Sequence, residues 1–119
     1  MNKFQVNLTE HAIDDLKDIS KEFRDKIHQD LKTLESAPFP SGAYVKRLRG
    51  FRPPVYRLRS GDFRVLYHIH GNTVTILRVI DRKLLERVLK RLRGLSKTII
   101  RKNLIRRVAP WSSISKKKG

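Results

Sequence analysis

The hydrophobic periodicity of the chain changes near residue 43, and this change limits the folds open to it. Between residues 10 and 34, apolar side chains recur every three or four positions, as on one side of an amphipathic helix. Between residues 44 and 82, apolar and polar side chains largely alternate, as in strands with one buried face. A helical stretch followed by several strands is typical of an α+β domain.

A short strand and two helices are predicted in the first 40 residues. Residues 4–8 alternate as a strand does, and Thr9 is suited to cap the helix that follows. Ser20 can cap a second helix, which Pro38 and Pro40 end. The apolar stripes are Ala12, Ile13, Leu16 and Ile19 in the first helix, and Phe23, Ile27, Leu31 and Leu34 in the second. Helices joined this closely should form an antiparallel hairpin.

The second half of the chain is predicted to form a meander of strands. The expected strands are residues 55–59, 63–70 and 73–80, with turns at 60–62 and 70–72, and residues 44–49 should form a strand or an extended approach to one. Consecutive strands joined by hairpins pair antiparallel, and the helical hairpin would cover one face of the sheet. We therefore expect a two-layer α+β fold, with an N-terminal strand and helical hairpin packed on an antiparallel sheet.

A C-terminal helix is predicted over residues 83–93, with Gly94 as a natural stop. Its apolar side consists of Leu85, Val88, Leu89 and Leu92. We expect one domain over residues 1–93 and a basic C-terminal extension over residues 94–119. Apolar spacing over residues 99–108 suggests a second short basic helix within the extension.

Charge is distributed very unevenly along the chain. Its 28 Lys and Arg residues and 11 Asp and Glu residues give a net charge of +17. Residues 1–39 carry six basic and eight acidic side chains, a net of −2, whereas residues 40–119 carry 22 basic and three acidic ones, a net of +19. Such a charge density attracts polyanions, of which nucleic acid is the usual one. A solubilising or membrane-surface charge is the alternative.

The chain shows no feature of an exported or membrane-inserted protein. It has no cysteine, and no apolar stretch approaches the roughly 18 residues of a membrane span. We expect a soluble, cytoplasmic protein that does not contact a membrane.

Most enzyme signatures are missing from the sequence. It has no phosphate-binding loop, zinc-protease motif or nucleophile elbow. The helical carboxylates fit a solvated face or an orienting charge better than a metal site, so we expect no metal centre; they are Asp14, Asp15, Asp18 and Glu22.

Arginines gather on the predicted sheet instead. Strand alternation places Arg57 and Arg59 on one face and places Arg64 and His68 together on the next strand. The last strand should add Arg78, with Arg82 just beyond it. Like charges this close repel, so the pattern favours a site that an anion such as phosphate neutralises. A solvated sheet face is the alternative.

Three segments resemble the core of the RelE/ParE toxin superfamily. They are Leu48-Arg49-Gly50, the string YRLRSGDFRVLY over residues 56–67, and ILRVIDR over residues 76–82. The resemblance follows the element order over residues 3–93, and the 56–67 string is its most specific part. It implies a RelE-like fold for residues 1–93.

The resemblance implies a toxin that cuts messenger RNA on the ribosome. RelE-like toxins use no metal or other cofactor: the ribose 2′-hydroxyl attacks the adjacent phosphorus and leaves a 2′,3′-cyclic phosphate. Arg64 and Arg82 match family arginines that would stabilise charge in the transition state. The expected RNA-gripping residues are Arg57, Arg59, Arg78, Lys46 and Arg49.

The sequence departs from the family in its proton-transfer residue. Many active members carry a tyrosine or histidine shortly after the arginine that follows the last strand, but residues 83–87 contain neither. His68, whose unperturbed pKa suits a general base, and Glu86 are the candidate replacements. The gap keeps two alternatives open: a ParE-like inhibitor of DNA gyrase and a non-catalytic nucleic-acid-binding member of the fold.

The resemblance also implies partners. Toxins of this type are held inactive in a heteromeric complex with a cognate antitoxin, and RelE-like members act on the ribosome and its messenger RNA. An acidic antitoxin segment would cover the basic surface and associate quickly through charge attraction.

Overall fold

Helices and strands follow one another in the predicted order in the structure, a computed structural model that describes residues 3–93 and 108–110. The elements are β1 (Gln5–Thr9), α1 (Glu10–Lys17), α2 (Lys21–Thr33), β2 (Val45–Leu48), β3 (Val55–Ser60), β4 (Phe63–His70), β5 (Thr73–Asp81), the 3₁₀ helix η1 (Arg82–Leu84), α3 (Leu85–Arg93) and β6 (Val108–Pro110). The predicted α+β organisation is confirmed.

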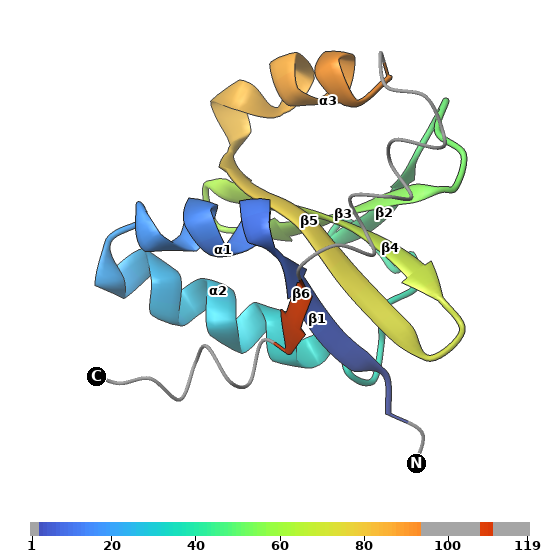
Figure 1. The fold of residues 1–119 in the computed structure, drawn as a ribbon, viewed down its shortest axis with the longest axis horizontal. Helices are drawn as coiled ribbons and strands as arrows, with labels where there is room; N and C mark the ends of the chain where they lie inside the picture. Colours follow the sequence, from blue (N-terminus) through green and yellow to red (C-terminus); the bar gives the residue numbers. More distant parts are fainter. Residues whose placement is uncertain (1–2, 94–107, 111–119) are drawn as a thin grey trace.

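The strands form one mixed sheet in the order β2-β3-β4-β5-β1-β6 (Figure 1). The meander from β3 to β5 is antiparallel, as expected, and β2 is a strand that pairs antiparallel with β3. β1 pairs with β5 in parallel, so the sheet is not antiparallel throughout. β6 pairs antiparallel with β1 and belongs to the segment that the sequence placed in the basic extension. The helix suggested for residues 99–108 lies outside the described residues apart from Val108, which is in β6.

Hydrogen bonds join the helical hairpin to the sheet and its two helices to each other. The Thr9 hydroxyl caps α1 by accepting from the N–H of Ala12 at 3.2 Å, and it donates to the Ile76 carbonyl of β5 at 2.9 Å. Ser20 stands at the N-cap of α2 as predicted, but its side chain makes no capping hydrogen bond. Arg24 in α2 donates to the Leu16 and Ile19 carbonyls, which holds the two helices together.

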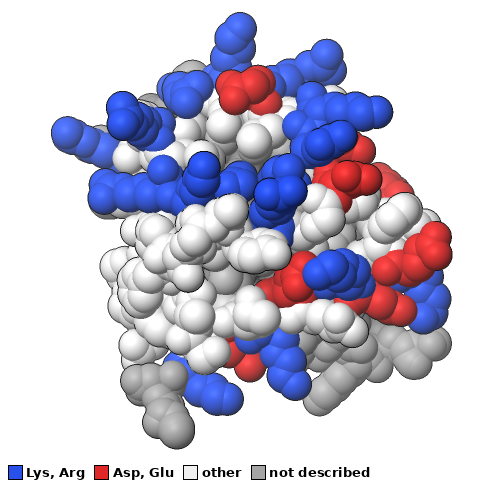
Figure 2. Space-filling model, turned by 180° about the vertical axis from the view of Figure 1, so that it is seen from behind, with Lys and Arg blue, Asp and Glu red and all other residues white. Residues whose placement is uncertain are grey.

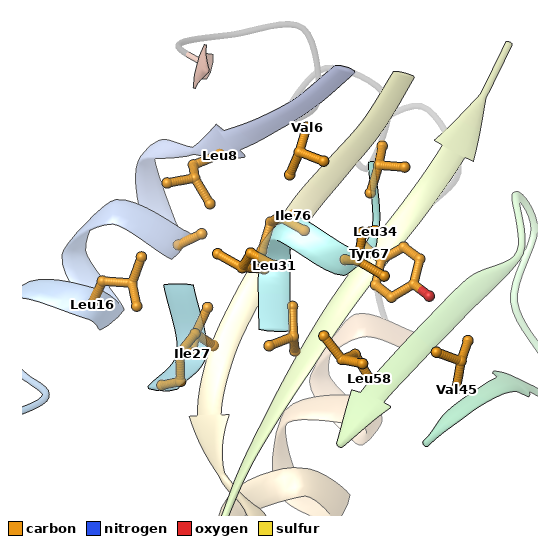
Figure 3. Close-up of a cluster of buried hydrophobic side chains, with 14 of the residues drawn as sticks. Val6, Leu8, Leu16, Ile27, Leu31, Leu34, Val45, Leu58, Tyr67 and Ile76 are labelled. Carbon is orange, nitrogen blue, oxygen red and sulfur yellow. The ribbon is translucent and has the colours of Figure 1, made fainter. Parts of the chain in front are cut away.

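Two apolar clusters lie on opposite faces of the sheet. The larger packs α1 and α2 against the sheet (Figure 3); its labelled residues are Val6, Leu8, Leu16, Ile27, Leu31, Leu34, Val45, Leu58, Tyr67 and Ile76. The smaller packs α3 against the other face, where Leu89 is buried among Phe51, Val55, Leu66, Leu77 and Ile80. The predicted apolar side of α3 therefore packs on the chain's own sheet.

An irregularity in β5 changes the direction of a side chain that the sequence assigned to the basic face. Leu66 pairs with Arg78 but Tyr67 pairs with Ile76, so Leu77 is an extra residue in β5. Such a bulge disturbs the alternation of side chains along a strand. Arg78 consequently meets Asp15 of α1, which accepts from its Nε at 2.8 Å and from its Nη2 at 3.0 Å. Asp15 also accepts from the backbone N–H of Val79 at 2.8 Å.

Replacing Asp15 tests how firmly α1 is joined to β5. We expect Asp15→Asn to lower the free energy of unfolding by about 2 kcal/mol, because it leaves the partly buried Arg78 without its carboxylate. Asp14→Asn, an exposed neighbour on the same helix, should change it by less than about 0.5 kcal/mol. Urea denaturation of both variants measures the difference, and equal stability would contradict this role of Asp15.

Candidate functional site

Four arginines lie together on the sheet face away from α1 and α2. Arg57 and Arg59 in β3 and Arg64 in β4 alternate with Leu58 and Val65, whose side chains are buried beneath the two helices. The β3–β4 register sets Arg59 directly opposite Arg64. The fourth arginine, Arg82, follows β5 at the start of η1. We call Arg57, Arg59, Arg64 and Arg82 the arginine cluster.

The members of the arginine cluster repel one another. Burial lowers the pKa of Arg57, a residue that is 8% exposed, and the charges of Arg64 and Arg59 lower it further. Burial also lowers the pKa of Arg64, and the charges of Arg59 and Arg82 lower it further, while the Asp62 and Asp81 carboxylates act in the opposite direction. A guanidinium group nonetheless keeps its proton in proteins, so the face holds four like charges within electrostatic reach.

Backbone carbonyls orient two of these guanidinium groups. Arg57 donates from Nη2 to the Ala43 carbonyl at 3.3 Å. Arg64 donates from Nη1 to the carbonyls of Gly61 and Phe63, each at 2.9 Å. Because a carbonyl has no net charge, these bonds position the groups without neutralising them.

Arg82 is held next to the β3–β4 turn by Asp62. Its backbone N–H donates to the Asp62 carbonyl at 2.9 Å, and its Nε lies 3.9 Å from Asp62 Oδ1. Both side chains are more than half exposed (59% and 73%), so this ion pair contributes little. The Asp81 carboxylate accepts from the N–H of Lys83 and so begins η1. Arg82 therefore has a fixed backbone and an accessible guanidinium.

The other sequence-predicted RNA contacts divide between two places. Lys46 in β2 is exposed and lies opposite Arg57, so it extends the cluster towards the sheet edge. Arg49 is also exposed, but it follows Leu48, which pairs with Val55. It therefore lies past the end of β2 that is distant from Arg59.

Arg78 is not part of the arginine cluster, which corrects the expectation from strand alternation. Its guanidinium makes the bidentate bond to Asp15 described above, and this hydrogen bond raises its pKa. The sequence placed Asp15 on a solvated helix face, yet Asp15 lies three residues after buried Ala12 and four before buried Ile19. That helical spacing could have indicated a carboxylate facing the sheet.

His68 lies on the predicted strand face but is buried, with 3% of the residue exposed. Its Nδ1–H donates to the Pro54 carbonyl at 2.6 Å, and its buried Nε2 has no hydrogen-bond partner. Burial lowers its pKa. The expected general base is therefore closed off from an RNA substrate at this face. Glu86, the other candidate, is exposed in the first turn of α3.

Basic side chains also gather on one face of the molecule as a whole. Figure 2 shows Lys and Arg side chains in a band across the upper half of the face that it draws, with acidic groups mainly to the right and an uncharged area below. α3 contributes exposed Arg87, Lys90, Arg91 and Arg93 to the basic residues of the domain. Within residues 3–93 and 108–110, no three potential metal ligands lie together, and no helix is long and apolar enough to cross a membrane.

Comparison with known proteins assigns the chain to a family. The profile of the ParE toxins of type II toxin–antitoxin systems (parDE) matches residues 6–85. A Methanocaldococcus jannaschii protein named as a RelE1 toxin is 35% identical over 83 residues, which cover 68% of this chain and 91% of that protein. The chain belongs to the RelE/ParE family of type II toxin–antitoxin toxins. This confirms the resemblance carried by residues 48–82.

Solved structures of RelE/ParE toxins share the fold. The archaeal RelE–RelB complex from Pyrococcus horikoshii OT3 is similar with a TM-score of 0.59 and 25% identity, over 67% of this chain and 96% of that one. The RelBE2 toxin–antitoxin complex from Mycobacterium tuberculosis has a TM-score of 0.56 and 28% identity, over 67% of this chain and 99% of that one. Isolated Escherichia coli RelE has a TM-score of 0.54 and 21% identity, over 76% of this chain and 98% of that one, and it shows the fold alone. The predicted RelE-like fold is confirmed.

The pH dependence of stability tests the burial of His68 in this RelE/ParE toxin. Because its pKa is lowered from 6.5 in the folded state, the unfolded chain takes up a proton first as the pH falls. The stability due to neutral His68 is therefore complete well above pH 6.5 and is lost progressively below it. We expect His68→Gln, which can still donate to Pro54, to reduce the loss of unfolding free energy on acidification.

The control is His70→Gln, which replaces an exposed histidine on the same strand and should keep the wild-type slope. Urea denaturation at several pH values on either side of 6.5 measures all three proteins. Identical slopes for wild type and His68→Gln would show that His68 titrates normally.

Proposed function

We propose that this toxin is a ribosome-dependent, metal-independent endoribonuclease that cuts messenger RNA and so inhibits translation. The observation that carries the proposal is the arginine cluster. Four mutually repelling guanidinium groups lie on one sheet face, and among the described residues the one ion pair that involves them joins Arg82 to Asp62 at 3.9 Å. An RNA backbone supplies the negative charge that this face lacks.

The geometry suggests separate roles within the arginine cluster. Arg64, oriented by two carbonyls, and the accessible Arg82 would stabilise the charge that develops on the phosphorus oxygens as the 2′-hydroxyl attacks. Arg59 and Lys46 would hold the flanking phosphates and keep the attacking oxygen in line, while Arg57, which is 8% exposed, would add its positive charge from beneath them. The cluster would thus supply positive charge of the kind that a metal supplies in other nucleases.

Proton transfer calls for a different candidate from the one the sequence favoured. Since His68 is buried, we retain Glu86 as the proposed proton acceptor, because its carboxylate is exposed and four residues from Arg82. A guanidinium of the cluster would donate a hydrogen bond to the leaving 5′-oxygen and stabilise its negative charge, and this oxygen would then take its proton from water.

A cognate antitoxin is the proposed protein partner. The P. horikoshii and M. tuberculosis structures are complexes of a toxin with its antitoxin, and both match two thirds of this chain. The basic band on the sheet and α3 would attract an acidic antitoxin segment, which would compete with RNA for the arginine cluster.

Mapping messenger RNA ends in a cell-free translation reaction tests the nuclease activity. We expect the wild-type protein to cut only when ribosomes are present, and Arg64→Ala and Arg82→Ala to slow cleavage at least about 100-fold, through lost transition-state stabilisation. Arg47→Ala is the matched control, because Arg47 is exposed but pairs with Tyr56, whose side chain packs on the helix side of the sheet. Its cleavage rate should stay near that of wild type.

A DNA gyrase inhibitor is the second candidate function. The matching family profile is that of ParE toxins, and residues 83–87 lack the tyrosine or histidine that the resemblance led us to expect. Intact messenger RNA together with inhibited gyrase supercoiling would replace the first proposal with this one. If the protein neither cuts messenger RNA nor inhibits gyrase, the remaining candidate is a nucleic-acid-binding role without catalysis.

A further inference from the structure

A groove next to the arginine cluster is unexplained by the proposed cleavage chemistry. It lies between α2 and the edge of the sheet, has a volume of about 810 Å³, and is lined in part by Lys26, Asp30, Tyr44, Arg59 and Asp62. Arg59 belongs both to this groove, which lies on the α2 side, and to the arginine cluster on the other face, so the two meet at this edge of the sheet. An RNA chain held by the cluster would reach the groove by crossing this edge.

Tyr44 is the most exposed large apolar side chain among the described residues, at 66%. Its carbonyl accepts from the N–H of Arg59 at 2.8 Å, which places it opposite Arg59, and Arg59 in turn lies opposite Arg64. One row across the sheet thus reads Tyr44, Arg59, Arg64. An exposed aromatic ring beside cations that grip phosphate is the arrangement with which proteins hold single-stranded nucleic acid.

The charges in the groove favour a base over a phosphate. Asp30 accepts from Ser60 Oγ at 2.6 Å and lies 3.1 Å from Lys26 Nζ, so lysine and carboxylate offset each other. Asp62 adds a second carboxylate, with Arg82 Nε at 3.9 Å. A phosphate would be repelled by these oxygens, whereas a neutral nucleobase would find an aromatic face and hydrogen-bonding groups.

We propose that Tyr44 is a stacking platform for one unpaired base of single-stranded RNA, next to the phosphate held by Arg59 and Arg64. The inference rests on the proposed function in that it names how the same site positions its RNA. The ring fixes the nucleotide beside the scissile phosphate, and the groove walls set which base fits. Tyr44 is a positioning residue with no proton-transfer role.

The test uses short single-stranded RNAs that carry 2-aminopurine, a base whose fluorescence is quenched when it stacks. The full-length protein is titrated at low salt as wild type, Tyr44→Ala, Tyr44→Phe and Phe39→Ala. Phe39 is the control because it is also an exposed ring, at 53%, but contacts Phe4 and does not line the groove. We expect quenching at one position of the RNA, its loss in Tyr44→Ala with about tenfold weaker binding, and its retention in Tyr44→Phe and Phe39→Ala.

Unchanged affinity and quenching in Tyr44→Ala would overturn the inference, and so would an RNA affinity that falls equally in Phe39→Ala. The inference would also be overturned if Tyr44→Ala bound RNA normally but bound an acidic protein partner more weakly, because the ring would then serve a protein contact. Base stacking is measured without ribosomes or cleavage. Position-specific quenching that depends on Tyr44 therefore supports its stacking role even if messenger RNA is not cut. Conversely, if Tyr44→Ala binds RNA normally and still cuts messenger RNA, the stacking role is overturned and the nuclease proposal stands.

Discussion

Arg59 and Arg64 face each other across the β3–β4 hairpin because the apolar core fixes the register of these strands. Leu58 pairs with Val65, and both side chains are buried beneath α1 and α2. A slip of one residue would turn these apolar side chains to solvent and the arginines into the core. Burial of the core thus imposes a contact between like charges, at a cost of about 0.2–1 kcal/mol for such a pair.

The surroundings of the arginine cluster limit this repulsion without removing it. Arg57 and Arg64 donate to backbone carbonyls, and Arg82 has only a distant, exposed carboxylate partner in Asp62. Arg78 is different, because the β5 bulge brings it to Asp15 and to the helical layer. The sheet therefore separates a structural arginine, which joins α1 to β5, from arginines whose charge is available to a ligand. This division leaves a positively charged surface that meets a groove at Arg59.

Local patterns predicted much of this arrangement. Alternation placed Arg57, Arg59 and Arg64 on one face, and Thr9 caps α1 as its side chain suggested. The errors arose where distant residues decide the structure. An extra residue in β5 cannot be seen from alternation, and the partner of Arg78 lies 63 residues away. His68 has the spacing of an exposed strand residue, but the segment that contains Pro54 covers it. Parallel pairing of β1 with β5 likewise joins the two ends of the domain.

The most direct test asks whether the arginine cluster serves binding or stability. It measures two properties of Arg59→Gln at low salt: the free energy of unfolding and the affinity for single-stranded RNA. Arg47→Gln, with the same change in net charge on the other face, is the reference. The account predicts that Arg59→Gln is as stable as the reference or up to about 1 kcal/mol more stable, because a like-charge contact is relieved, while its RNA affinity falls below that of the reference. A clear loss of stability with unchanged RNA affinity would contradict it and would make the arginine cluster a structural feature of the sheet.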